Sequence, residues 1–96
     1  MKTILLKEST RKYKKWMVFI DNKWYHFGDN RYEDYTQHHD KERRRLYLLR
    51  HKNENWNKSN IKSPAFWSRY LTWEKPTIDS SIKYIEKKFN VKILKN

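Results

Sequence analysis

The stretch WMVFIDNKWYHF, residues 16–27, decides the fold class of this sequence. It holds two segments, WMVFI and WYHF, whose β-branched and aromatic residues are typical of strands. The residues between them, Asp21, Asn22 and Lys23, are polar and suit a turn. The sequence therefore predicts a β-hairpin that ends near Gly28, the only glycine. The type of the turn stays open, because the strongest hairpin signal, Asn-Gly, is absent.

Beyond the hairpin the pattern becomes helical, from Thr36 onward. The spacing of apolar and polar residues predicts a first helix over about residues 38–52. One side of it carries Tyr35, His39, Glu42, Leu46 and Leu49. Its other sides carry the basic residues Lys41, Arg43, Arg44, Arg45, Arg50 and Lys52. This helix is the most basic element of the chain.

Two further helices have recognisable ends. Ser63 before Pro64 is a typical N-cap, and it predicts a short helix over about residues 64–73, PAFWSRYLTW, whose rings are mostly expected in the core. Thr77 is the next N-cap. The regular recurrence of Ile78, Ile82, Ile85 and Phe89 predicts a helix over 78–89, followed by Asn90 as the C-cap. The segment VKIL can then return as a strand.

This order of elements predicts a single α+β domain over residues 1–96. Its small antiparallel sheet would comprise the N-terminal hairpin and the terminal strands KTILL and VKIL, packed on about three helices. An exposed edge strand would also allow two chains to pair as a homodimer.

Charge and composition restrict the classes of partner. The chain has 23 Lys and Arg against 11 Asp and Glu, a net charge of +12, and no cysteine. A small domain with this balance is attracted to polyanions. The lack of cysteine excludes disulfides and thiolate metal sites. No apolar run approaches the roughly 18 residues of a membrane span, so we expect no membrane partner.

Three groups of basic residues are candidates for nucleic-acid binding. The arginine-rich helix supplies Arg43, Arg44, Arg45 and Arg50, whose guanidinium groups suit phosphates. The segment around Tyr13 supplies Lys12, Lys14 and Lys15. Arg69 lies between the aromatic stripes of PAFWSRYLTW. The alternatives are a solvated helix face and, for KERRR, a nuclear-import signal.

The stretch GDNRYEDYTQHHD contains carboxylates and histidines that suggest a second chemistry. Its members are Asp29, Glu33, Asp34, His38, His39 and Asp40. Such residues can hold a metal for phosphodiester hydrolysis. However, no metal-binding spacing such as HExxH is present, and carboxylates that cap a helix N-terminus explain the same residues. We therefore predict no catalytic residues, no metal and no cofactor.

Four segments, FGDNRYEDYTQHHDKERRRLYLLRH, ENW, FWSRYLTW and KPTIDSSI, resemble a family of small basic proteins encoded by nucleocytoplasmic large DNA viruses, the giant viruses of amoebae and algae. The resemblance covers residues 27–82. Matching residues are Tyr32, Asp34, Tyr35, Thr36, His38, Asp40, Arg50, His51, Asn55, Trp56, Phe66, Trp67, Ser68, Arg69 and Trp73. Arg31 and Ala65 stand where the family pattern has glycine. The resemblance implies a viral protein of unknown function and supplies no activity.

These features predict a viral protein that binds nucleic acid, DNA more than RNA, through phosphates and with little sequence preference. Its role would be genome packaging or organisation in the virion or in the viral factory of the host cytoplasm. The alternative is an interaction module that acts on host proteins, including in the host nucleus. A metal-dependent nuclease is the third hypothesis.

Overall fold

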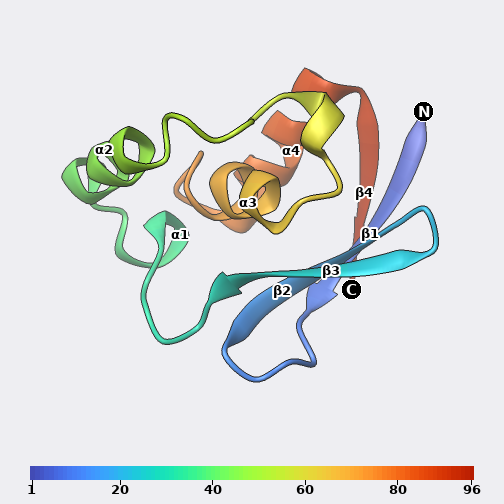
Figure 1. Ribbon diagram of the computed structural model, residues 1–96, viewed down its shortest axis with the longest axis horizontal. Coiled ribbons are helices and arrows are strands. Elements are labelled where there is room, and N and C mark those ends of the chain that lie inside the picture. Colours follow the sequence, from blue (N-terminus) through green and yellow to red (C-terminus); the bar gives the residue numbers. More distant parts are fainter.

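The protein folds into two layers, a four-stranded sheet and a set of helices that covers one of its faces (Figure 1). The computed structural model describes all residues, 1–96. The strands are β1 (Lys2–Glu8), β2 (Lys14–Ile20), β3 (Lys23–Asp29) and β4 (Val91–Lys95). The helical segments are α1 (Tyr35–His38), α2 (Lys41–Arg50), η1 (Lys58–Asn60), α3 (Pro64–Trp67), η2 (Ser68–Thr72) and α4 (Ile78–Phe89). The predicted α+β class is confirmed.

Strands β2 and β3 form the predicted hairpin. Their loop consists of Asp21 and Asn22, both with positive φ, 49° and 67°. Two left-handed residues form a type I′ turn, whose twist matches that of the strands, and Asp and Asn tolerate this conformation well. Lys2 and Lys62 each lie 2.8 Å from the Asp21 carboxylate, and their hydrogen bonds lower its pKa to about 2.

The order of strands in the sheet is β3-β2-β1-β4, and β4 runs parallel to β1. The prediction of an antiparallel sheet therefore holds for β1, β2 and β3 only. Asn90, the predicted C-cap, has φ 54° and reverses the chain directly after α4. The direction of β4 is thus set by the direction of α4, and the sequence VKIL carries no signal for it.

The predicted helix 38–52 is observed as α2, and the short helix α1 precedes it. His39 adopts the left-handed conformation, with φ 57°, and ends α1. Asp40 then caps α2, since its carboxylate accepts hydrogen bonds from the backbone N–H groups of Glu42 and Arg43. Part of the acidic and histidine-rich stretch therefore builds the sharp corner between α1 and α2.

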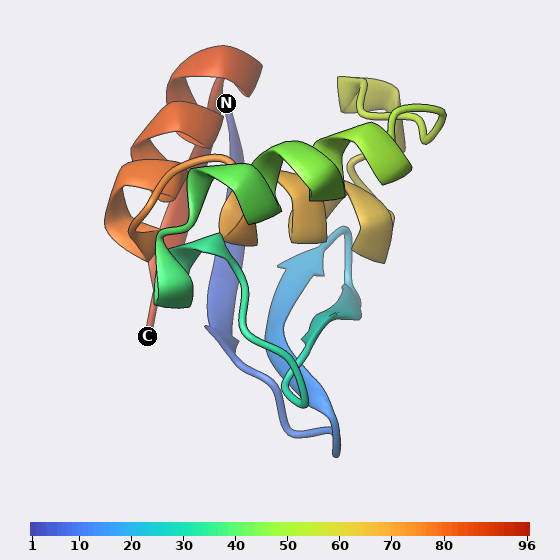
Figure 2. The same ribbon diagram turned by 90° about the vertical axis from the view of Figure 1, so that its left-hand side faces the viewer.

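The leucines of α2 predict that its aliphatic side packs against the protein, but a different side of the helix does so. Leu46 and Leu49 are exposed, and no residue of α2 is fully buried. The side chains that pack inward include Arg44 and Tyr47. Figure 2 views the molecule from the side of α2, which lies at the outer edge of the helical layer.

The core lies between the inner face of the sheet and the helices α3, η2 and α4. The predicted short helix 64–73 is observed as α3, which continues as the π-helical segment η2 to Thr72. Ser63 caps it, and its rings Phe66, Trp67 and Tyr70 are buried, as predicted. Fully buried side chains from the sheet include Ile4, Leu6, Val18, Ile20 and Phe27. None of the helices has the length and apolar character that crossing a membrane requires.

Candidate nucleic-acid interface

Two of the predicted phosphate ligands, Arg44 and Arg69, are paired inside the fold. Arg44 Nη2 lies 2.6 Å from Glu74 Oε2, and its Nε donates to a backbone carbonyl at 2.8 Å. Arg69 Nη1 lies 3.1 Å from Glu74 Oε1, and its guanidinium lies 4.8 Å and 4.7 Å from the ring centroids of Trp56 and Tyr70. The side chain of Arg69 is only 12% exposed. These two arginines join α2 and η2 to the segment before α4.

Glu74 is the centre of this arrangement. Its side chain is 8% exposed, and burial alone would raise its pKa. The charges and hydrogen bonds of Arg69 and Arg44 outweigh burial and hold the pKa of Glu74 below its ordinary value of 4.5. The carboxylate is therefore ionised at neutral pH, and both ion pairs are present.

Lys15 is also engaged within the fold. Its Nζ lies 2.7 Å from Asp34 Oδ2 and 2.6 Å from Gln37 Oε1, so it ties β2 to α1. Gly28 lies beside it with φ 77°, and a Cβ there would be 3.2 Å from the Cβ of Lys15. A glycine thus leaves the space and the backbone freedom that this approach requires.

Arg45 and Lys12 are exposed to solvent. Arg45 Nε donates to Glu42 at 3.0 Å on the surface of α2, where such pairs contribute little to stability. Lys12 lies on the connection between β1 and β2, with its Nζ 5.0 Å from the ring centroid of Tyr13. Neither side chain lines the cleft that holds the remaining candidates.

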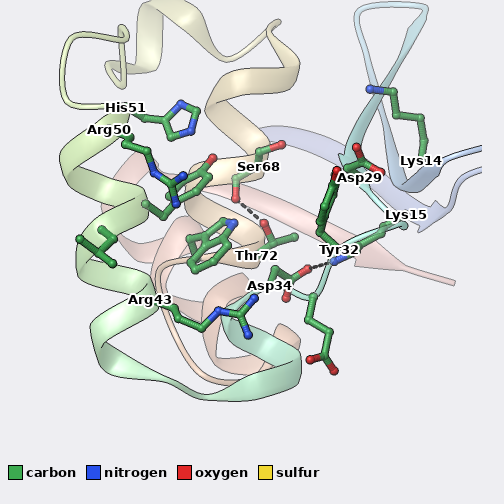
Figure 3. A pocket seen from close by; sticks show the side chains of 15 residues that line it. Lys14, Lys15, Asp29, Tyr32, Asp34, Arg43, Arg50, His51, Ser68 and Thr72 are labelled. Atoms are coloured by element: carbon green, nitrogen blue, oxygen red, sulfur yellow. Dashed lines mark hydrogen bonds and ion pairs between the residues drawn. The ribbon is translucent and has the colours of Figure 1, made fainter.

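The remaining three candidates, Lys14, Arg43 and Arg50, line one cleft of about 490 Å³ (Figure 3). Arg43 and Arg50 lie seven residues apart on the same side of α2, a rise of about 10 Å. Lys14 begins β2 on the other side of the cleft. The ion pairs of this region all involve other residues, so the charges of these three side chains are unpaired.

Aromatic rings line the same cleft. Tyr47 and Trp73 stack with their ring centroids 4.3 Å apart and their planes 4° from parallel, and His51 lies 4.3 Å from Tyr47. Burial raises the pKa of Tyr47 to about 12, with Glu54 contributing, so its hydroxyl stays neutral. Tyr32, on the loop between β3 and α1, is 70% exposed and faces α2 across the cleft (Figure 3).

The carboxylates of the cleft are mostly neutralised by partners. Asp29 binds Arg31, whose hydrogen bonds lower the pKa of Asp29 to about 2, and Asp34 binds Lys15. Glu33 is the only lining carboxylate without an ion pair. The cleft also contains the three unpaired cations Lys14, Arg43 and Arg50, so its net charge is positive.

The acidic and histidine-rich stretch does not gather into a metal site. No group of three His, Asp or Glu side chains is placed to hold a metal ion. The Nδ1 of His38 accepts a hydrogen bond from the backbone N–H of Asp40 at 2.9 Å, and burial lowers the pKa of His38. These residues shape the corner between α1 and α2.

Sequence reasoning missed Tyr47 as a member of the cleft. Arg43, Tyr47 and Arg50 are spaced four and three residues apart, which places them on one side of a helix. This spacing is the sequence feature from which Tyr47 could have been predicted to lie beside Arg43 and Arg50. It was obscured because Arg44 and Arg45 adjoin Arg43 and carry the same charge.

The protein is therefore an α+β domain with one positively charged cleft that is lined by aromatic rings. The chain belongs to a family of unknown function, DUF5754, which matches residues 4–51. The matched segment runs from β1 through α2 and contains Lys14, Tyr32, Arg43, Tyr47 and Arg50. No curated protein and no solved structure matches the chain.

Proposed function

We propose that this protein binds nucleic acid through phosphate contacts, with little sequence preference. The observation that carries the proposal is the cleft in which Lys14, Arg43 and Arg50 have unpaired charges. A phosphate that binds there meets cations that already lack a carboxylate partner. Binding therefore gains charge-assisted hydrogen bonds without breaking an ion pair of the fold.

The overall charge of the chain supports the same partner. A net charge of +12 on 96 residues attracts any polyanion and speeds its association. Phosphate contacts carry no sequence information, since every nucleotide presents the same group. DNA remains the preferred partner in this proposal, with RNA as the other substrate to be compared.

A viral setting is part of the proposal. It is supported by the resemblance of residues 27–82 to small basic proteins of nucleocytoplasmic large DNA viruses. In that setting the protein would package or organise the viral genome in the virion or the viral factory.

The salt dependence of DNA binding tests the proposal. Fluorescence anisotropy with a short labelled duplex, repeated at rising NaCl, should give a log–log slope of roughly −0.9 for each phosphate neutralised. Replacing Lys14, Arg43 and Arg50 together by Ala should weaken binding and reduce the slope by about 1 for each phosphate that is no longer neutralised.

A matched control removes equal charge elsewhere. Lys83, Lys87 and Lys92 lie on and beside α4, around a separate hollow. Their triple Ala variant has the same net charge as the cleft variant and should retain most of the affinity. Equal losses in the two variants would show that binding depends on total charge and not on the cleft. No binding by the wild type at low salt would overturn the proposal.

A second candidate function, an interaction module for host proteins, is favoured by the face of the sheet that the helices leave open. Trp24, Phe19, Leu5 and Leu94 are paired in a row across all four strands. Leu5 and Leu94 are exposed. A partner that survives nuclease treatment of a host lysate, and that a Leu5→Ser/Leu94→Ser variant no longer captures, would favour this function.

A further inference from the structure

Tyr32 is the feature of the cleft that phosphate binding does not explain. It is 70% exposed, and its ring belongs to none of the aromatic or cation–π pairs of the fold. The other exposed ring, Tyr13, is engaged, since it lies 4.5 Å from the guanidinium of Arg31. A free ring beside unpaired cations offers a flat surface for stacking.

The side of the cleft opposite Tyr32 is formed by aromatic rings that pack against one another. Tyr47 stacks on Trp73, and Trp73 in turn contacts His38, with ring centroids 5.3 Å apart. Of these rings, Tyr47 and Trp73 line the cleft, together with Arg43 and Arg50. A planar group that enters the cleft would therefore lie between a free ring and a fixed aromatic wall.

The size of the cleft limits what can enter it. Its volume of about 490 Å³ lies within the range of roughly 300–1,000 Å³ that is typical of sites for small organic groups. A nucleotide fits a space of this size, and a double helix does not. In a duplex the faces of the bases are also covered by their neighbours, so only phosphates could reach the rim.

A second hollow adjoins the cleft, which favours a polymer over a free nucleotide. This hollow, of about 540 Å³, lies beside the start of β2. Lys14, Lys15 and Asp34 line both spaces, so the two meet at these residues. A chain of nucleotides could extend from α2 past Lys14 into the second hollow.

We propose that the cleft binds single-stranded nucleic acid, with an unpaired base stacked on Tyr32 and the adjoining phosphates bound by Arg43, Arg50 and Lys14. This inference rests on the proposed function and names the form of nucleic acid that the site accepts. Stacking on an aromatic ring tolerates any base, which agrees with little sequence preference. The groups that are recognised, phosphate and base face, occur in both DNA and RNA.

The test compares strands of the same length with and without pairing. Anisotropy titrations with oligo(dT), oligo(U) and a DNA duplex use the wild type and the variants Tyr32→Leu and Tyr32→Phe. Tyr32→Leu keeps bulk but removes the π-face, and we expect it to weaken single-strand binding at least about fivefold and leave duplex binding unchanged. Tyr32→Phe retains the ring and should bind as the wild type does. Thermal melts of each variant check that the fold is intact.

Each outcome separates this inference from the proposed function. Tighter binding of either single strand than of the duplex, lost in Tyr32→Leu, supports the inference, and the tighter of the two strands identifies the sugar. Equal binding of single strands and duplex, with no effect of Tyr32→Leu, overturns the inference and leaves phosphate binding standing. No binding to any of the three overturns both.

Discussion

Arg43 and Arg44 are neighbours in the sequence, and the fold uses their charges in opposite ways. Arg44 points inward and binds the buried carboxylate of Glu74 and a backbone carbonyl. Arg43 is exposed and lines the cleft without an ion-pair partner. One helix therefore supplies both a cation that holds the protein together and a cation that is available to a ligand.

The comparison shows that total charge is a poor guide to a binding site. Of the eight basic residues predicted to bind nucleic acid, four are in ion pairs: Lys15, Arg44, Arg45 and Arg69. The buried pairs act on stability, because removing one partner leaves the other charge desolvated. Lys14, Arg43 and Arg50 are exposed, so they should act on affinity and contribute little to stability.

Replacing Glu74 should have the largest effect on stability. Glu74→Gln leaves Arg44 and Arg69 without their shared anion, and we expect a loss of about 3 kcal/mol in the free energy of unfolding. Urea denaturation measures it. Glu42→Gln, which breaks the exposed pair with Arg45, is the control and should change the free energy of unfolding little. Equal losses in the two variants would contradict the structural role of Glu74.

Lysine substitutions at the two neighbouring arginines should separate their roles more finely. Arg44→Lys keeps the charge but loses the planar group that contacts Glu74 and a carbonyl together, so we expect about 1–2 kcal/mol of destabilisation. Arg43→Lys should leave stability within about 0.5 kcal/mol and preserve most phosphate binding. Denaturation and anisotropy on both variants check this. A destabilised Arg43→Lys would mean that Arg43 has a structural partner.

Acid should destabilise the fold, because it protonates the paired carboxylates. The pKa of Glu74 is lowered in the folded protein, so its contribution to stability is complete above 4.5 and is lost as the pH falls through the lower folded value. Asp21, Asp29 and Glu42 also have lowered pKa values and add to the same trend. Glu74→Gln should therefore show a shallower loss of stability than the wild type as the pH falls below 4.5. Identical pH dependence would contradict the assignment.

Local patterns predicted most elements of the fold. The hairpin, the caps Ser63 and Thr77, and the helix ending at Asn90 depend on residues close in sequence, and the structure confirms them. The parallel direction of β4 and the break at His39 were not predicted. The direction of β4 depends on how distant segments pack, which a one-dimensional pattern does not record. The break at His39 is local: it depends on the left-handed backbone of His39 and on the cap Asp40.

The candidate site was predicted only in part, because the partners of charged residues are not visible in the sequence. Glu74 lies thirty positions after Arg44 in the chain, yet it binds Arg44 and Arg69 together. Nothing in the run Arg43-Arg44-Arg45 distinguishes the middle residue from its neighbours. The orientation of α2 decides which arginine faces the protein, and the stacking of Tyr47 on Trp73 is one of the contacts that fix this orientation.

The central claim is that Arg43 and Arg50 bind the ligand whereas Arg44 and Arg69 stabilise the fold. A nuclear magnetic resonance titration that follows arginine side-chain signals tests this claim most directly. Adding oligo(dT) to isotope-labelled protein should shift the Nε–H signals of Arg43 and Arg50 and leave those of Arg44 and Arg69 in place. Alanine variants of each arginine assign the signals. Shifts confined to Arg44 and Arg69, or no shift at Arg43 and Arg50, would contradict the account.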